Sequence, residues 1–200
     1  MGETRATRTT QTRARIKAAL VDAIGEKGFE ALTVSDLTRR AGINRGTFYL
    51  HFVDKYDLLE QLEDEFIARI ETALLASRTE AAAPSEPLDM FPYPTVLEAL
   101  SLVRSDFAFV AAISGPGGDP DFSSKLKRVV GSILDLGLRR SGARVTALPD
   151  IPETYARELV MGQVLTIMGV WIGRGGAESP EQVARMICTA KDLAPAMLVK

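Results

Sequence analysis

The stretch from Thr33 to Phe52, TVSDLTRRAGINRGTFYLHF, has the pattern of two short helices joined by a tight turn. Thr33 is a suitable N-cap for the first helix, and Asp36 stands three positions later, where it can complete a capping box. Gly42 can adopt the left-handed conformation that ends a helix without a Cβ clash. Asn44 can then cap the second helix. The stretch therefore predicts a helix-turn-helix.

The second predicted helix begins with small and polar residues and continues with aromatic ones. In the recognition helix of a helix-turn-helix, the first side chains reach base edges in the major groove of DNA. Arg45, Gly46 and Thr47 occupy that place, whereas Phe48 and Phe52 share one face that we expect to be buried. Similar turns between helices also occur in helical proteins that bind no DNA, so the motif alone leaves a purely structural interpretation open.

The segment resembles the DNA-binding domain of TetR/AcrR-like transcriptional regulators over roughly the first quarter to third of the chain. That pattern has a threonine-capped helix, an A-G-[IV]-[ST] turn, a G-T-[FIL]-Y-x-[HY]-F run and a K-x-x-L step. Here these correspond to Thr33, residues 41–44, residues 46–52 and residues 55–58. Asn44 stands where serine or threonine is more usual, and it caps a helix equally well.

The resemblance implies a DNA-binding transcriptional regulator, with phosphate contacts from Tyr49, His51 and Lys55. It further implies a homodimer, most simply a ligand-responsive repressor that binds a near-palindromic operator. The full set of expected DNA-binding residues is Thr33, Arg45, Gly46, Thr47, Tyr49, His51 and Lys55.

Charge is distributed unevenly along the chain, although the formal net charge is only −2. Residues 1–56 hold ten Lys and Arg against six Asp and Glu, whereas residues 57–200 hold fourteen against twenty. A basic first part favours contact with a polyanion. We expect an N-terminal basic arm to contact phosphate, although a solvated terminus would have the same composition. Its residues are Arg5, Arg8, Arg13, Arg15 and Lys17.

Composition indicates an ordinary globular protein of 200 residues, with 46% hydrophobic and 25% charged residues. The single cysteine, Cys188, cannot form an internal disulfide and is expected in the core. The polar, basic N-terminus does not resemble a signal peptide, and no apolar run is long enough to span a membrane. These features lead us to expect a cytoplasmic protein without membrane contact.

Helical periodicity dominates, and the predicted fold is all-α. We expect an N-terminal three-helix DNA-binding domain with its basic arm at residues 1–56, and a helical effector-binding and dimerisation domain at residues 57–200. A proline-rich loop is expected at 77–94 and another loop at 141–151. Besides the motif, helices are predicted at 12–27, 54–74, 95–113, 122–140 and 153–172, with a last helix that opens at Ser179 and includes Met197.

The helix around residues 159–172 is apolar on nearly every side, which predicts that a second copy of the chain covers it. The resemblance also implies a dimer interface formed by the last two helices. A central helix in a monomer is the alternative. The expected interface residues are Leu159, Gly162, Leu165, Gly169, Val183, Met186 and Ile187.

Aromatic and sulfur-containing residues of the second domain could line a pocket for a small apolar effector, as effector sites do in related regulators. The same residues could equally form a filled core. The expected pocket residues are Phe91, Tyr93, Phe107, Phe109, Met161, Met168 and Trp171.

No catalytic arrangement is evident, and we expect neither enzyme activity, nor a cofactor, nor a metal site. His51 is the sole histidine and lies within the DNA-binding motif. The acidic pair Glu63 and Asp64 is expected on a solvated helix face. A glycine-rich run at 115–118 lacks the ending of a phosphate-binding loop and predicts a turn. Two other classes remain as rivals: a helical module that binds protein partners, and a small all-α enzyme.

Overall fold

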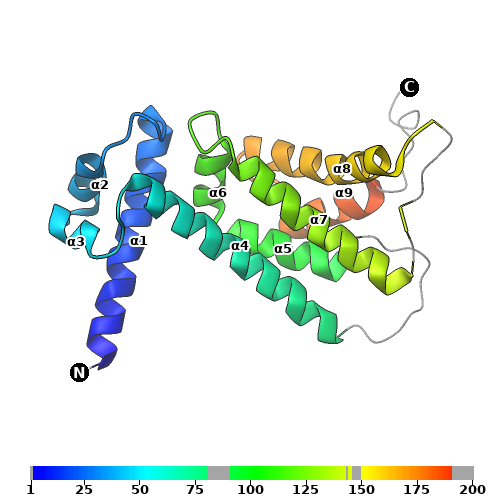
Figure 1. The fold of residues 1–200 in the computed structure, drawn as a ribbon, viewed down its shortest axis with the longest axis horizontal. Coiled ribbons are helices and arrows are strands. Elements are labelled where there is room, and N and C mark those ends of the chain that lie inside the picture. The colour runs from blue at the N-terminus through cyan, green and yellow to red at the C-terminus, as the bar shows by residue number, and fades with distance from the viewer. Residues whose placement is uncertain (1, 81–90, 143, 146–149, 191–200) are drawn as a thin grey trace. The chain divides into compact units, whose positions relative to one another are not determined.

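The computed structural model describes residues 2–80, 91–142, 144–145 and 150–190 of the chain (Figure 1). Every regular element in these ranges is an α-helix, which confirms the predicted all-α fold. The elements are α1 (Gly2–Lys27), α2 (Val34–Ala41), α3 (Arg45–Tyr49), α4 (Lys55–Glu80), α5 (Tyr93–Ser105), α6 (Phe107–Ser114), α7 (Phe122–Ser141), α8 (Glu153–Gly173) and α9 (Pro180–Ala190). Most of the expected proline-rich loop, residues 81–90, lies outside the described residues, as does Met197.

The helix expected at 95–113 is in fact two helices, α5 and α6, which separate at Asp106. The backbone of Asp106 leaves the helical region, with φ −124° and ψ 27°. Arg69 of α4 holds this corner, since its guanidinium donates to Asp106 Oδ2 at 3.1 Å and to Ser105 Oγ at 3.1 Å. Serine and aspartate compete with helical backbone bonding, which favours a break where an arginine can fix them. The prediction of one continuous helix was therefore wrong.

The chain divides into two compact units. Unit 1 comprises Met1–Phe66 and Ala108–Phe122, and unit 2 comprises Ile67–Phe107 and Ser123–Lys200. Helices α4, α6 and α7 contribute residues to both units. The helix-turn-helix thus shares its unit with a segment from much later in the chain, whereas the division of function at residue 56 stays a prediction.

The core of unit 1 forms around α1, whose buried residues recur at helical spacing: Ile16, Leu20, Ala23 and Ile24. Phe66 of α4 packs near Phe109 of α6, with ring centroids 6.5 Å apart. Glu63 is buried, with only 1% of its surface exposed, contrary to the expected solvated face. Glu63 is four residues from Leu59 and three from Phe66, both of which are buried, so the three share one face of α4. The buried face of α4 is therefore wider than its apolar residues alone indicate.

The core of unit 2 centres on Trp171, which is buried and donates from Nε1 to the carbonyl of Glu178 at 2.9 Å. Its ring meets that of Phe107 edge-on, with centroids 5.6 Å apart. The expected capping box of the last helix is confirmed, because Ser179 N–H donates to Gln182 Oε1 at 2.8 Å and Gln182 N–H donates to Ser179 Oγ at 3.4 Å. Cys188 is half-buried, and its thiol lies 3.4 Å from the carbonyl oxygen of Phe91.

Candidate nucleic-acid interface

The first helix of the motif, α2, begins with the capping box that the sequence predicts. Asp36 N–H donates to Thr33 Oγ1 at 3.2 Å, and Thr33 N–H donates to Asp36 Oδ2 at 3.1 Å. At the other end, Gly42 is left-handed with φ 60°, and Ile43 N–H donates to the carbonyl of Thr38 at 3.0 Å. Both ends of α2 are therefore fixed by local backbone chemistry.

The carboxylate of Asp36 collects three further contacts. It accepts from Lys27 Nζ at 2.5 Å, from the Thr33 hydroxyl at 2.6 Å and from Arg39 at 3.1 Å. These contacts, Lys27 foremost, hold the pKa of Asp36 well below its usual range. The negative charge lies in the first turn of α2, where the helix dipole also favours it. Asp36 thus ties the end of α1 to the start of α2.

The second helix of the motif, α3, starts from Asn44. Its side-chain Oδ1 accepts from Thr47 N–H at 2.7 Å and from the Thr47 hydroxyl at 3.0 Å. Phe48 is fully buried and packs against Phe52, with ring centroids 5.6 Å apart. The aromatic face anchors α3 to unit 1, which leaves the opposite face of the helix at the surface.

That surface face brings together several of the expected DNA-binding residues. Arg45 and Gly46 are exposed, and so is half of the Tyr49 side chain, at 49%. A guanidinium nitrogen of Arg45 lies 3.3 Å from the Tyr49 hydroxyl, so the two side chains lie along the same side of α3. Thr47 and His51 are half-buried beside this face. The start of α3 thus presents the donors needed to contact base edges and phosphate.

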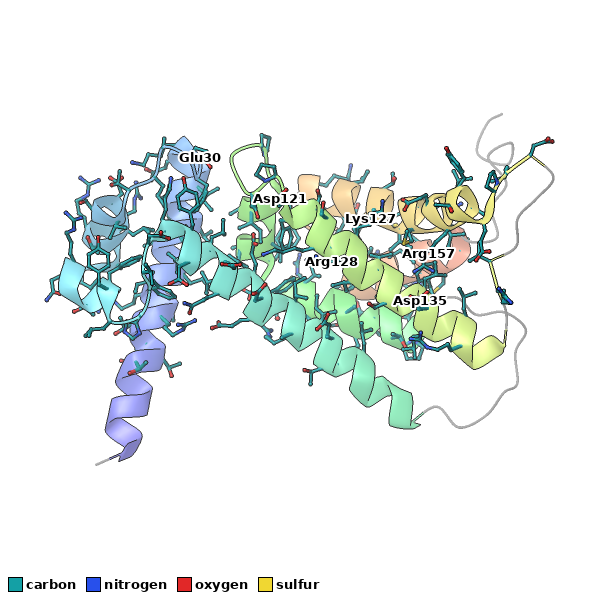
Figure 2. The ribbon with its side chains drawn as sticks, viewed as in Figure 1. Glu30, Asp121, Lys127, Arg128, Asp135 and Arg157 are labelled. Atoms are coloured by element: carbon teal, nitrogen blue, oxygen red, sulfur yellow. The ribbon has the colours of Figure 1, made fainter. Side chains whose placement is uncertain are left out.

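Lys55 and Thr33, like Thr47, already have hydrogen-bond partners within the protein. Lys55 Nζ donates to the carbonyl of Phe29 at 3.0 Å and to that of Glu30, labelled in Figure 2, at 2.8 Å. The same ammonium lies above the aromatic rings of Phe29 and Tyr56. The hydroxyl of Thr33 is occupied by the capping box. An ammonium has three donors, so a phosphate contact by Lys55 would have to use the third. That contact stays a prediction.

The basic residues of α1 differ most clearly from expectation. Arg13 bonds to Gln61 and Glu65 of α4 and stacks over Phe52, and the ammonium of Lys17 lies 4.4 Å from the ring centre of Phe109. Arg13 and Lys17 therefore face the rest of unit 1, and the phosphate contact expected of the basic arm stays a prediction. The side chains of Arg5 and Arg8 lie outside the described residues.

Arg15 has a role that the sequence does not reveal. Its guanidinium donates to the carbonyl of Gly42 at 2.9 Å, directly at the turn between α2 and α3. This charge-assisted bond joins the turn to α1. Arg15 is therefore a positioning residue for the motif.

Comparison with known proteins agrees with this geometry. Residues 16–62 match the family model described as bacterial regulatory proteins, tetR family, and this range contains α2, the turn and α3. Residues 16–62 therefore form a DNA-binding domain of the tetR family.

Several proteins similar to this chain come from Bacillus subtilis (strain 168). An uncharacterised helix-turn-helix transcriptional regulator, YxbF, is 35% identical over 80 residues, which cover 40% of this chain and 20% of that protein. The chain therefore spans about a fifth of the length of this relative. The fatty acid metabolism regulator protein is 24% identical over 163 residues, which cover 77% of this chain and 80% of that protein.

Solved structures share the fold over nearly the whole chain. The fatty acid degradation regulator FadR from Bacillus halodurans superposes with a TM-score of 0.61 at 17% identity, covering 89% of this chain and 93% of that one. FadR from B. subtilis in complex with stearoyl-CoA gives a TM-score of 0.57 at 18% identity, covering 88% and 95%. The overall fold of this chain is thus similar to that of these two FadR structures.

The expected effector-pocket residues are not all brought together. Most of them lie in unit 2, where Phe91, Met161, Met168 and Trp171 are buried. Phe109 belongs instead to unit 1, where it packs against Phe66 and Lys17. The cavity inside unit 2 has a volume of only about 30 Å³, and Phe91 and Met168 are the expected residues among those that line it. Tyr93 and Phe107 are half-buried. Most of the expected pocket residues therefore form part of a packed core.

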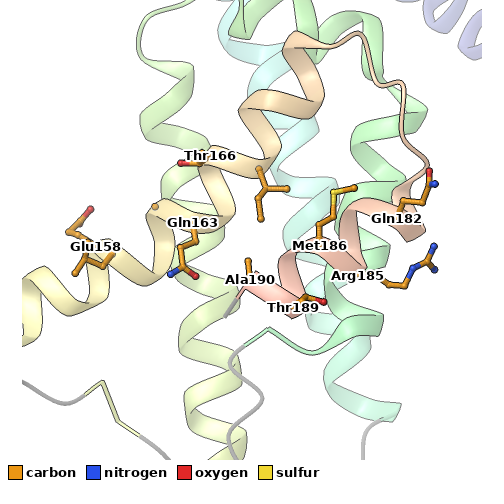
Figure 3. A pocket seen from close by; sticks show the side chains of 11 residues that line it. Glu158, Gln163, Thr166, Gln182, Arg185, Met186, Thr189 and Ala190 are labelled. Carbon is orange, nitrogen blue, oxygen red and sulfur yellow. The ribbon is translucent and has the colours of Figure 1, made fainter. Parts of the chain in front are cut away.

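The expected dimer-interface residues divide between a surface and the core. Leu159 and Met186 are exposed, at 60% and 48%, and together with Gly162 they line an open groove of about 910 Å³ between α8 and α9 (Figure 3). Gly169 is exposed and Leu165 is half-buried. In contrast, Val183 and Ile187 are buried within unit 2 itself. The side of α9 that carries these two residues packs inward, and the interface itself stays a prediction.

Two features are absent from the part of the chain that the structure describes. None of the helices there is long and apolar enough to cross a membrane. Within the same ranges, no three His, Cys, Asp or Glu side chains are grouped closely enough to hold a metal ion.

Proposed function

We propose that this regulator is a homodimeric, ligand-responsive repressor that binds a near-palindromic operator in the cytoplasm. The observation that carries the proposal is the exposed start of α3, where Arg45, Gly46 and Tyr49 lie on one face above the buried Phe48. Two such helices, placed in successive major grooves about 34 to 36 Å apart, would read two symmetric half-sites.

Within each half-site, we assign base readout to Arg45, with guanine as its natural target because a guanidinium can bond to O6 and N7 together. The small side of Gly46 lets the backbone approach the groove, and Thr47 follows at its edge. Tyr49 and His51 would fix the register through phosphate contacts. Selection of bound duplexes from a random DNA pool tests this assignment. We expect an inverted repeat; enrichment of no sequence, or of a single asymmetric half-site, would contradict it.

The exposed apolar face of α8 and α9 supports the homodimer. Tyr155, Leu159 and Val170 on α8 and Met186 on α9 are large apolar side chains at the surface. Soluble monomers rarely expose contiguous apolar patches of this kind, and a second copy of the same face would cover them.

An apolar effector is supported by the similarity to FadR of B. subtilis, which was solved with stearoyl-CoA. Drug-sized ligands need pockets of about 300 to 1,000 Å³, whereas the cavity within unit 2 holds about 30 Å³. Unit 2 would therefore have to open to accept an acyl chain. An effector that favours the opened state lowers the affinity of the protein for DNA. By linkage, bound DNA lowers the affinity for the effector by the same factor.

A gel shift with the selected operator tests the effector response. We expect stearoyl-CoA to release the DNA, and stearate without coenzyme A serves as a comparison. A complex that stays intact at every stearoyl-CoA concentration would refute this effector while leaving the DNA-binding proposal in place. The rival proposal of a protein-interaction module predicts no discrete, competable complex with any duplex.

A further inference from the structure

A second groove, distinct from the apolar one, runs between α7 and α8 on the surface of unit 2. It has a volume of about 480 Å³. Figure 2 shows Lys127, Arg128 and Asp135 along α7 and Arg157 at the start of α8. The groove is lined by three cationic side chains, Lys127, Arg128 and Arg157, and one carboxylate, that of Asp135. Cations gathered in a concave surface attract anions.

Arg157 is held in position at the centre of this groove. One guanidinium nitrogen donates to Asp135 Oδ1 at 2.7 Å, and another lies 3.4 Å from the carbonyl of Gly131. A Cβ added at Gly131 would lie at ordinary contact distance, 3.4 Å from the guanidinium and 3.5 Å from Met161 Sδ, so the backbone of α7 passes close to both side chains here. A guanidinium has five donors, so Arg157 retains donors that a ligand can use.

The neighbouring cations can also accept an anionic partner. Arg128 is exposed and makes no ion pair or side-chain hydrogen bond that involves any other described residue. Lys127 is paired with Glu158 at 2.6 Å, with nearly half of each side chain exposed. Exposed pairs of this kind contribute little to stability, so a stronger anion can replace the carboxylate. Two serine hydroxyls, from Ser124 and Ser132, add hydrogen-bonding groups along α7.

We propose that the α7–α8 groove binds the phosphate groups of a small ligand. Arginine forks match phosphate oxygens in pairs, and this groove offers Arg157 and Arg128 together with the ammonium of Lys127. The buried Met161 forms part of the groove, and it lies on the same helix as Val164 and Met168, which line the small core cavity. A ligand with a phosphate-bearing head group and an apolar part would thus find both chemistries along α8.

Binding of phosphate in the α7–α8 groove does not depend on the proposed effector response. Only an effect of that binding on DNA affinity would rest on the proposed function. The test is isothermal titration calorimetry on the full chain at low salt, with coenzyme A and inorganic diphosphate as the two probes. Binding of both probes would assign the groove to phosphate as such. Binding of coenzyme A alone would assign it to a phosphate-bearing head group. Either result supports the site.

Arg157→Gln and Arg128→Gln are each expected to weaken binding about tenfold, because each removes charge-assisted hydrogen bonds. Arg174→Gln is the matched control, since Arg174 is an exposed arginine of the same unit that pairs with the carboxylate of Glu178, as Arg157 pairs with that of Asp135. Ser132→Glu keeps both arginines and places a negative charge beside the groove, so it should weaken binding without removing a cation. Circular dichroism establishes that each variant is folded.

The proposal is overturned if neither probe gives saturable binding to the wild-type chain, or if Arg174→Gln loses as much affinity as the groove variants. A gel shift with coenzyme A added separates this result from the effector proposal. If coenzyme A binds in the groove without releasing DNA, the phosphate site is supported. The groove then has no part in regulating DNA binding.

Discussion

The backbone amide of Phe29 donates a hydrogen bond of 2.7 Å to the carbonyl of Gly117. The first residue follows the end of α1 and the second lies between α6 and α7, so the bond joins two segments of unit 1 that are far apart in sequence. The approach is close because neither Gly28 nor Gly117 has a side chain. A Cβ at Gly117 would lie 3.1 Å from the Cα of Gly28.

Gly117→Ala is therefore expected to destabilise unit 1 by about 1 to 3 kcal/mol, since the methyl group meets backbone that cannot easily move. Urea denaturation monitored by circular dichroism measures this loss. Gly25→Ala is the control. Gly25 lies within α1 with open space around it, so alanine there should stabilise the protein by up to about 1 kcal/mol. Equal effects of the two substitutions would contradict the close approach.

Caps and turns were predictable from sequence because their chemistry is local. Thr33 and Asp36 are three residues apart, and Gly42 follows its helix directly, so the sequence pattern alone determines the hydrogen bonds. The apolar stripe of α1 was likewise visible at helical spacing. The DNA-binding motif of this family is therefore recognisable in the amino-acid sequence itself.

The partners of the basic residues in α1 could not be predicted, because they are distant in sequence. Arg15 bonds to a carbonyl 27 positions away, and Arg13 bonds to a side chain 48 positions away. The sequence shows that such residues are charged. It does not show which part of the folded protein their side chains face. The break at Asp106 was missed for the same reason, since Arg69 of another helix holds it.

Arg45→Ala should weaken binding to a selected operator by about 1 to 3 kcal/mol and relax the preference at one base position in each half-site. The loss follows from its exposed place at the start of α3. Fluorescence anisotropy with the operator, and with variants of it at each position, measures both effects. Arg39→Ala, which removes an exposed arginine of α2, is the matched control and should leave base preference unchanged. An operator preference that survives Arg45→Ala intact would remove Arg45 from base readout.

Lys55→Met tests whether Lys55 acts on the fold or on DNA. The structure predicts a loss of about 1 to 2 kcal/mol in unfolding free energy, because the carbonyls of Phe29 and Glu30 lose a charged donor. A phosphate contact predicts, in addition, a weaker dependence of DNA affinity on salt. Measuring both the urea midpoint and the salt slope separates these roles. A flattened slope with unchanged stability would favour the phosphate role alone.

The lowered pKa of Asp36 leads to a prediction about the stability of the fold at low pH. Its folded-state pKa is lowered, chiefly by Lys27, so its contribution is present above the unfolded pKa of about 3.9 and is lost as pH falls through the folded value. Asp36→Asn should lower the urea midpoint at pH 7, and the difference from wild type should shrink as pH falls below about 4. A constant difference down to the lowest accessible pH would show that Asp36 contributes through shape alone.

The apolar groove between α8 and α9 leads to a prediction about assembly. Met186→Glu and Leu159→Glu each place a charge on a side chain that is exposed in one protomer and would be covered in the proposed dimer. Burying an unpaired charge is costly, so both variants should dissociate to monomers while they remain folded. Val53→Glu, at an exposed apolar residue of unit 1, is the control and should leave the molecular mass unchanged. Light scattering coupled to size exclusion reports the mass, and dimers that persist in both groove variants would place the interface elsewhere.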